Sequence, residues 1–482
     1  MNKGDHSPTA FQSITRLPDD VIQEMFIWYV NDDPFVDVPF RPMEEENHSP
    51  SSYWDSDSDD SEDDDNYSPD EIPSFEEKPF VNLPLPFVVS RICSAWRRVA
   101  LSTPRLWNNV CIATFDPRSK RLAAEWLLKA RSCPVSIIID DLASDAHFNI
   151  YDELREFLSA YHIKNLELPL LSKTCSILPL ILAELPEERI IHLESLSLVD
   201  LEPGYQPFLF LDNARYPCLR ELQLTAQFVG DTINFPWTSL RRLDSTTVPL
   251  PMMKCLDVLR ESVSLEVCFL GISSDLGSDT TVEDLYLPTL HELILSFHIE
   301  ADVGNFIRWL TTPNLKILTV ECGFCSEMSL LRWSDLEYSR MMERSNRPLN
   351  HLTVRRSDEV DAQTILQSSP MLVEVSLHQA RFQQETLDDL ETGRLAPLLQ
   401  HFCVEEISGV NDEAFLEMLE RRIQNSVRIA GAAHGLMPLS SVMALGNGRD
   451  PKFRIVYPRA PEPMKYFYTT DIFLPFSPYI IR

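Results

Sequence analysis

A leucine pattern repeats along the chain beyond residue 130 and constrains its fold more than any other feature of the sequence. The unit is L-x-x-L-x-L, often with Pro at or just before its start. Clear units begin near 165, 192, 217, 236, 288, 313, 348, 370 and 397. The first Leu of successive full units falls at 193, 219, 240, 290, 315, 349, 372 and 399, and Leu265 in SLEVCFL halves the one double step.

Most of these steps are 21 to 27 residues long, which is the period typical of leucine-rich repeats. We expect the leucines of each short strand to point inward and to stack on those of the next repeat. Helical segments such as 302–310, 329–343 and 412–422 should cover one face of the sheet. The sequence therefore predicts an irregular α/β leucine-rich-repeat solenoid, or horseshoe, over residues 111–460, with a C-terminal tail at 461–482. Ordinary alternating strands in another α/β domain are the alternative.

Residues between the leucines of a strand should face away from the core, because side chains alternate along a strand. This reasoning predicts a row of outward side chains that form a substrate surface across the repeats. The predicted surface contains Glu221, Gln223, Glu292, Thr319, Glu321, His351, Arg355, Glu374, His378 and Glu405. Their polar character favours a partner with basic and hydrogen-bonding groups over an apolar helix. Mere solvation of these side chains, or recognition through the segment 452–482, are the alternatives.

Two short apolar segments precede the repeats. The first is L-P-D-D-V-I-Q-E-M-F at 17–26, where Pro18 and Asp19 favour a helix start. The second is V-S-R-I-C-S-A-W-R-R-V-A at 89–100, followed by LSTPRLWNNV at 101–110. Each has apolar residues at the spacing of one helix face, and we expect helices over 17–30 and 88–101.

These segments together resemble the F-box, and the 101–110 continuation looks like the tail of the large F-box families of mushroom-forming fungi. The resemblance covers a split F-box at 12–30 and 80–110, an all-helical hairpin. It implies docking on the Skp-family adaptor of a cullin ubiquitin ligase. The residues that it implies for this contact are Leu17, Pro18, Val21, Ile22, Met25, Phe26, Val89, Ile92, Cys93, Trp96 and Val99. Phe26 and Trp96 are the expected anchors. A helical hairpin that merely caps the repeats is the alternative.

The resemblance implies a substrate-recognition subunit of a Skp–cullin–F-box ubiquitin ligase. Its partners would be the adaptor, a cullin through the adaptor, and an unknown protein substrate. The alternative is a leucine-rich-repeat scaffold that binds the adaptor or other partners without a role in ubiquitination. An enzyme of unknown class is a third hypothesis. Under the first two hypotheses the chain has no catalytic residues of its own.

Residues 31–79 form an insert between the two halves of the split F-box. From 44 to 77 the chain has 15 acidic residues and no Lys or Arg. Such a segment cannot bury enough apolar surface to offset its ordering entropy, so we expect a disordered, solvated loop. Ser56 and Ser61 each precede an Asp by three positions and would suit acid-directed kinases, although the run could simply keep the loop in solution.

Composition excludes several classes of function. The formal charge of −31 disfavours nucleic acid and anionic membranes as partners. No run of about 18 apolar residues occurs, and the N-terminus lacks the apolar region of a secretory signal. Ten scattered Cys fit a reducing compartment, so we expect a cytoplasmic or nuclear location.

No sequence motif for catalysis or for a resident cofactor is present. P-loop, G-x-S-x-G, H-E-x-x-H and G-x-G-x-x-G patterns are missing from the sequence. Cys322 and Cys325 form a C-x-x-C pair without a second pair at zinc-site spacing, which favours structural thiols. His351, His378 and His401 recur beside neighbouring leucine motifs, but chance placement on a polar strand face is favoured over a ligand cluster. We expect no cofactor and no metal.

Overall fold

The computed structural model describes a mixed α/β chain that divides into two compact units, Met1–Phe148 and Asn149–Arg482. The described residues are 18–32, 85–142, 150–170, 178–200, 214–224, 237–274, 283–298, 301–323, 330–429, 437, 439, 441–444, 453–456 and 467–468. Leu17 and nearly all of the 31–79 insert lie outside them, as does the 461–482 tail except 467–468. The predictions about these segments stay predictions.

The first unit is helical at its start and ends in a pair of parallel strands. Its elements are α2 (Asp19–Asp32), α3 (Leu85–Ile92), α4 (Ser94–Ser102), η1 (Pro104–Leu106), β1 (Asn109–Ile112), α5 (Pro117–Leu127), η2 (Leu128–Ala130) and β2 (Val135–Ile139). β1 and β2 pair in parallel from Asn109 opposite Ser136 to Ile112 opposite Ile139. The boundary predicted at 110/111 falls inside β1, and β2 lies in the predicted repeat range, whereas both strands belong to the first compact unit.

The prediction of a single helix over 88–101 is wrong, because the helix is interrupted at Cys93. This residue has extended backbone angles, and its Sγ accepts a hydrogen bond from Trp96 N at 3.5 Å, so it is the N-cap of α4. A capping side chain satisfies one of the free N–H groups of a helix's first turn. The amphipathic period continues across the break, which is why the apolar pattern alone gave one helix instead of two.

The second unit is built from alternating strands and helices. Its helical elements are α6 (Ile150–Ser159), α7 (Leu178–Glu184), α8 (Glu187–Ile190), η3 (Trp237–Ser239), α9 (Met252–Glu261), α10 (Gly304–Ile307), α11 (Asp335–Arg344), α12 (Ala362–Ser368), α13 (Gln384–Thr392) and α14 (Asp412–Ile429). Its strands are β3 (Ile163–Leu170), β4 (Ser195–Asp200), β5 (Glu221–Leu224), β6 (Arg242–Pro251), β7 (Val267–Ser274), β8 (Leu285–Tyr286), β9 (Glu292–Phe297), β10 (Leu310–Thr311), β11 (Ile317–Cys322), β12 (His351–Arg355), β13 (Val360–Asp361), β14 (Glu374–Arg381), β15 (His401–Ser408), β16 (Ser441–Ala444), β17 (Phe453–Val456) and β18 (Phe467–Tyr468).

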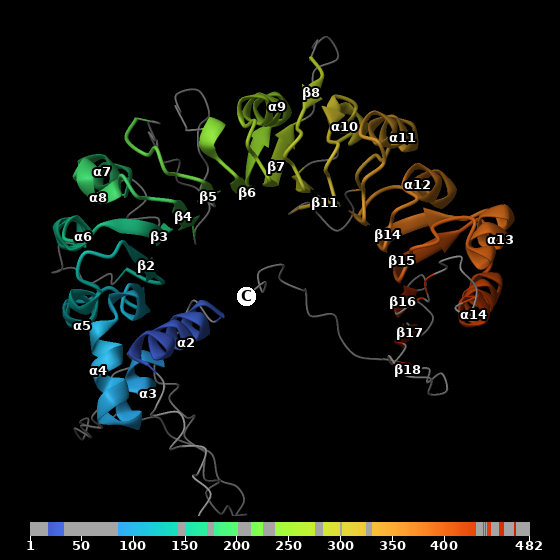
Figure 1. The fold of residues 1–482 in the computed structure, drawn as a ribbon. Helices are drawn as coiled ribbons and strands as arrows, with labels where there is room; N and C mark the ends of the chain where they lie inside the picture. The colour runs from blue at the N-terminus through green and yellow to red at the C-terminus, as the bar shows by residue number, and fades with distance from the viewer. Residues whose placement is uncertain are drawn as a thin grey trace, which may run out of the picture. The chain divides into compact units, whose positions relative to one another are not determined.

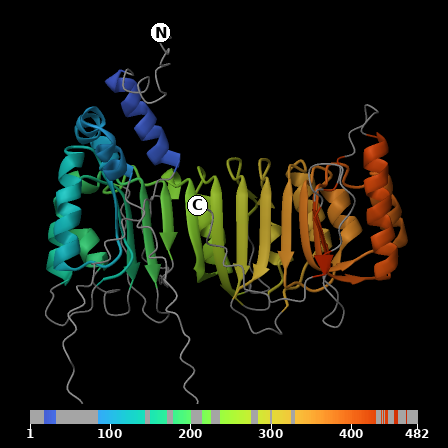
Figure 2. The same ribbon diagram turned by 90° about the horizontal axis from the view of Figure 1, so that it is seen from below.

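One large sheet organises this unit. From β3 to β16 its main strands follow the order β3-β4-β5-β6-β7-β9-β11-β12-β14-β15-β16, and each pair is parallel. β17 and β18 then continue the sheet in antiparallel pairing. Figure 2 shows the strands side by side, and Figure 1 shows the helices along one face of the sheet. The predicted strands at the leucine motifs are confirmed.

The core consists of the motif leucines stacked from strand to strand. The middle position of successive strands is in register from Leu166 through Leu196, Leu222, Leu243, Cys268, Leu293, Leu318, Leu352 and Val375 to Phe402. These side chains are 0–3% exposed. Full burial of one Leu stabilises a fold by about 1.5–3 kcal/mol. Each strand gains this stabilisation through contacts between its buried side chains and those of the neighbouring strands.

The Pro that often begins a motif has a local role in the turn before the strand. The N–H of Leu219, Leu315 and Leu372 donates to the carbonyl three residues earlier, at 3.1–3.3 Å. In each of these turns Pro is the second residue, where its fixed φ suits a β-turn. The turn then delivers the first motif Leu to the core, since all three of these leucines are fully buried.

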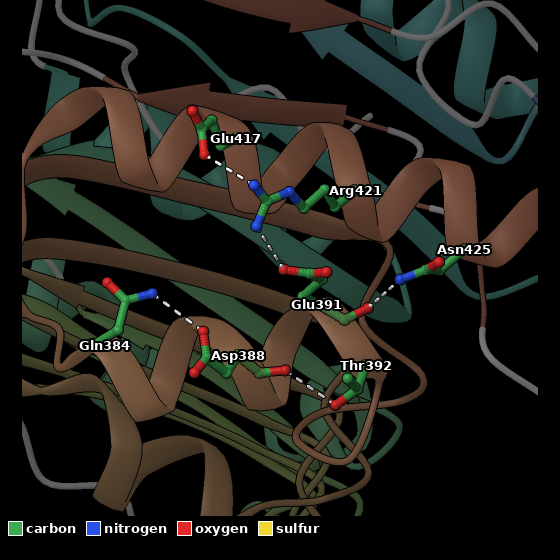
Figure 3. Close-up of polar contacts among 7 residues, drawn as sticks. All are labelled: Gln384, Asp388, Glu391, Thr392, Glu417, Arg421 and Asn425. Atoms are coloured by element: carbon green, nitrogen blue, oxygen red, sulfur yellow. Dashed lines mark hydrogen bonds and ion pairs between the residues drawn. The ribbon is translucent and has the colours of Figure 1, made fainter.

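Arginines join successive helical layers at their ends. Arg215 donates to two carbonyls at the end of α7, and Arg344 of α11 donates to the last carbonyl of α10 and to two carbonyls after it. Arg422 of α14 donates to Leu390 O, Leu395 O and Ala396 O. The last four carbonyls of a helix have no partner within it, so each Arg satisfies acceptors of the preceding layer. Figure 3 shows the exposed side of the α13–α14 contact, where Arg421 reaches Glu391.

Candidate functional site

Each unit has one surface that is a candidate for binding a partner. The surface of the first unit is formed by α2, α3 and α4. Phe26 and Trp96 pack edge to face with their ring centroids 5.1 Å apart. Ile22, Phe26 and Val99 are 1–5% exposed, and they form the core between α2 and α4. These predicted contact residues therefore stabilise the unit itself. Their contact with an adaptor stays a prediction.

Other apolar residues of the same helices remain on the surface. The exposed large apolar side chains here are Val21, Met25, Val88, Ile92 and Leu101, each 40–49% exposed. Val21 and Met25 are four residues apart on α2, and Val88 and Ile92 are four apart on α3, so each pair shares a helix face. We call these five residues the helical apolar surface. Exposed apolar side chains that share a face are candidates for contact with a partner.

The remaining predicted adaptor residues have mixed positions. Pro18 is exposed, and its carbonyl accepts the first helical hydrogen bond of α2 from Ile22 N at 3.1 Å. Cys93 is partly buried as the cap of α4, and Trp96 is partly exposed. Leu17 and the side chain of Val89 lie outside the described residues. Val88 and Leu101 are exposed but were not among the predicted adaptor residues. An amphipathic pattern shows which residues are apolar, but it does not show whether they face the core of the unit or a partner.

The second surface is the face of the sheet opposite the helices. The predicted outward residues of β9, β11, β12, β14 and β15 are partly or fully exposed, in contrast to the leucines between them. The register brings Glu292, Ile317, His351, Glu374 and His401 into one row across these strands. Glu221 and Gln223 lie on β5, and Ser197 Oγ donates to Gln223 Oε1 at 3.2 Å. The predicted residues of β9 to β15 thus share one face, and those of β5 lie beyond β6.

Contacts between polar side chains cross this face between neighbouring strands. His351 Nδ1 lies 3.2 Å from Glu374 Oε2, and His378 Nε2 lies 3.5 Å from Glu405 Oε2. Arg355 Nη1 lies 3.9 Å from Glu321 Oε2. Cross-strand pairs at solvent-accessible positions contribute little to stability.

The face also has an apolar part that the polar prediction missed. The partly exposed side chains of Val267, Phe269, Ile294 and Ile317 lie at outward positions of β7, β9 and β11. Phe269 is in register with Ile294, and the guanidinium of Arg242 lies 4.9 Å from the Phe269 ring centroid. We call these four residues the apolar cluster. The alternation of inward and outward side chains along β9 and β11 also places Ile294 and Ile317 outward. The apolar cluster could therefore have been predicted in part from the sequence.

One region of the face is closed by the backbone of β6. The register between β6 and β7 shifts after Ser245, and the bulge places Thr246 O over Gly271. Thr246 N and Oγ1 donate to Asp244 Oδ1, and burial raises the pKa of Asp244. His298 Nε2 lies 3.0 Å from Thr246 O. This bulge ends the open part of the face at β6.

Among the residues that the structure describes, no group of three His, Cys, Asp or Glu could hold a metal ion. Cys322 is buried, and Cys325 lies outside the described part of the chain. None of the described helices combines the length and the apolar character needed to cross a membrane. Comparison with protein-family models gives no match, and comparison with curated proteins gives none.

Proposed function

We propose that this chain is a substrate-recognition subunit of a Skp–cullin–F-box ubiquitin ligase. In this proposal α2, α3 and α4 are the F-box, and the second unit is a leucine-rich-repeat solenoid whose open sheet face binds the substrate. The chain performs no bond chemistry under this proposal. It holds a substrate protein near the ubiquitin-conjugating enzyme, so its function is positioning.

The observation that supports this proposal most is the helical apolar surface on the segments with F-box character. Of the 13 large apolar side chains exposed in the described regions, five belong to these three helices. Burial of a large apolar side chain stabilises a complex by about 1.5–3 kcal/mol. Since these five residues are 40–49% exposed, covering them contributes about 1 kcal/mol each, or roughly 5 kcal/mol together. That is one part of the binding free energy of a specific complex, since a dissociation constant of 1 μM corresponds to about 8 kcal/mol.

The test is adaptor binding by a variant that changes this surface and spares the core. Val21→Asp combined with Met25→Asp places two charges where the adaptor would bury apolar surface. Both side chains are exposed in the free protein, so the variant should fold. We expect at least a hundredfold loss of affinity for a recombinant Skp-family adaptor, measured by calorimetry. Substitution of the core pair Phe26 and Trp96 would be less informative, because it removes a contact inside the unit.

A matched control comes from the same unit. Leu128 is 77% exposed and lies on η2, outside the F-box segments. Leu128→Asp should leave adaptor affinity within about twofold of the parent chain. Equal affinity of the parent chain and the Val21/Met25 variant would contradict the proposed docking surface.

A scaffold that binds the adaptor without ubiquitination is the second candidate, because it would use the same hairpin. Recovery of a cullin with the tagged chain separates the two functions. The ligase subunit should co-purify with cullin through the adaptor, and the double Asp variant should lose both. Recovery of adaptor without cullin would favour the scaffold.

A further inference from the structure

We infer that the open sheet face of the second unit binds a basic amphipathic helix through the apolar cluster and the carboxylates beside it. This inference rests on the proposed function only in calling the bound helix part of a substrate. The sequence predicted a polar face that binds a partner with basic and hydrogen-bonding groups. The inferred partner has an apolar face as well, because the structure places four apolar side chains on the sheet face.

The apolar cluster is central to the argument because apolar residues on an open sheet face have no role in the core. Phe269 and Ile294 are paired across β7 and β9, with Val267 and Ile317 beside them. The motif leucines already fill the core on the other side of these strands. The helices of this unit lie along that leucine side (Figure 1). The cluster therefore offers apolar contact to a molecule other than the unit's own helices.

The carboxylates beside the apolar cluster favour a partner with positive charge. Glu292 lies between Val267 and Ile317 in the same row, and it has no ion-pair partner among the described residues. Glu321, Glu374 and Glu405 follow on β11, β14 and β15, where Glu321 lies 3.9 Å from Arg355 and the other two lie beside His351 and His378. The partner that complements this border carries Lys or Arg next to apolar side chains.

The spacing of the strands favours a helix lying across them. Neighbouring strands are about 4.7–4.9 Å apart, and one helical turn rises about 5.4 Å. Successive turns of a crossing helix therefore meet successive strands. Its apolar side chains at i, i+3 or i+4, and i+7 would cover β7, β9 and β11, and its basic side chains would reach the carboxylates of β9, β11 and β14. The bulge of β6 limits the contact on the other side.

The experiment uses the full chain and three labelled 18-residue peptides in fluorescence anisotropy at 150 mM salt. The first peptide is an amphipathic helix of Leu and Lys. The second replaces every Lys with Glu, and the third has the composition of the first in an order that gives no apolar face. We expect the first peptide to bind at least tenfold more tightly than either of the others. Equal binding of the first and third peptides would overturn the inference, because it would show attraction by net charge alone.

Variants locate the peptide on the face. Ile294→Ser with Ile317→Ser removes half of the apolar cluster, and Glu292→Lys with Glu374→Lys reverses two carboxylates. Each should weaken the first peptide at least tenfold. The matched control is Glu261→Lys with Glu413→Lys, a reversal of two exposed carboxylates on α9 and α14, and it should change affinity less than twofold. Equal effects of the face and control reversals would overturn the inference.

A second copy of the chain is the competing occupant of the apolar cluster. Sedimentation of the full chain tests it, since dimers that dissociate in the Ile294/Ile317 variant would assign the cluster to self-association and contradict the inference. Adaptor affinity is measured on the same preparations. If the parent chain binds the adaptor but none of the peptides, this inference alone is contradicted, whereas a parent chain that binds the first peptide but no adaptor contradicts only the proposed docking function.

Discussion

Replacement of Arg422 by Met tests the account of how successive helical layers are joined. The side chain is 1% exposed, and its guanidinium donates to Leu390 O at 2.6 Å and to Ala396 O at 2.7 Å. Each buried carbonyl left without a partner costs about 1–3 kcal/mol. Relief of a buried charge offsets part of this cost, since burial lowers the pKa of Arg422 to about 10. We expect a net loss of about 2–4 kcal/mol.

Arg421 provides the matched control on the same helix. Its guanidinium lies 3.5 Å from Glu391 and 3.1 Å from Glu417, and its side chain is 56% exposed (Figure 3). Exposed ion pairs contribute about 0–1 kcal/mol. Arg421→Met should therefore cost less than 1 kcal/mol, although it removes the same charge from the neighbouring position.

Hydrogen exchange of the α13 and α14 amides measures this difference where it arises. A local loss of 2 kcal/mol or more speeds exchange by about 30-fold, and we expect this for Arg422→Met in 384–396 and 412–425. Arg421→Met should change exchange there by less than about fivefold. Equal acceleration in the two variants would refute the reasoning that the buried guanidinium, by satisfying carbonyls, stabilises this junction.

Three further predictions concern separate parts of the chain. Gly271→Ala should lower the melting temperature by more than Gly323→Ala, because the new Cβ lies 2.4 Å from the backbone oxygen of Thr246, whereas at Gly323 it meets the rotatable Ser296 side chain at 2.7 Å; equal shifts in thermal unfolding would contradict this. Burial raises the pKa of Asp335 to about 6 in the folded chain. Between about pH 4 and pH 6 the Asp335 carboxyl is therefore protonated in the folded chain and ionised in the unfolded chain, so the free energy of unfolding falls as pH rises through this range. Asp335→Asn should therefore gain stability relative to the parent chain between these pH values in urea titrations, and a constant difference would rule out this carboxyl as the cause. Replacement of 40–76 by a short Gly/Ser linker should leave adaptor affinity unchanged in calorimetry, whereas loss of helical signal would show that the insert has a structural role.

The strands could be predicted from sequence because their register depends on the motif leucines. Leu196, Leu293 and Leu352 are completely buried at the expected middle positions. A shift of one residue would turn every one of these side chains to the opposite face. A pattern under such strong constraint is visible in a single sequence, and the strand positions follow from it.

Features that depend on tertiary contacts could not be predicted in the same way. The division into α3 and α4 depends on the cap at Cys93, which leaves the amphipathic period unchanged. The role of Arg422 depends on carbonyls 26–32 residues away in sequence. The packing of Phe26 against Trp96 likewise joins residues on either side of the insert. Sequence patterns predicted α2 and α14 closely, whereas the segments expected at 302–310 and 329–343 form the shorter helices α10 and α11. The partners of the helical side chains required the structure.

The central claim is tested most directly by assembly with purified components. The chain, a Skp-family adaptor and the N-terminal part of a cullin are mixed, and the mass of the complex is measured by size-exclusion chromatography with light scattering. The account predicts a ternary complex containing one copy of each component, which forms only when the adaptor is present and is lost with the Val21/Met25 double Asp variant. A chain that elutes alone, with adaptor and cullin in a separate peak, would contradict the claim.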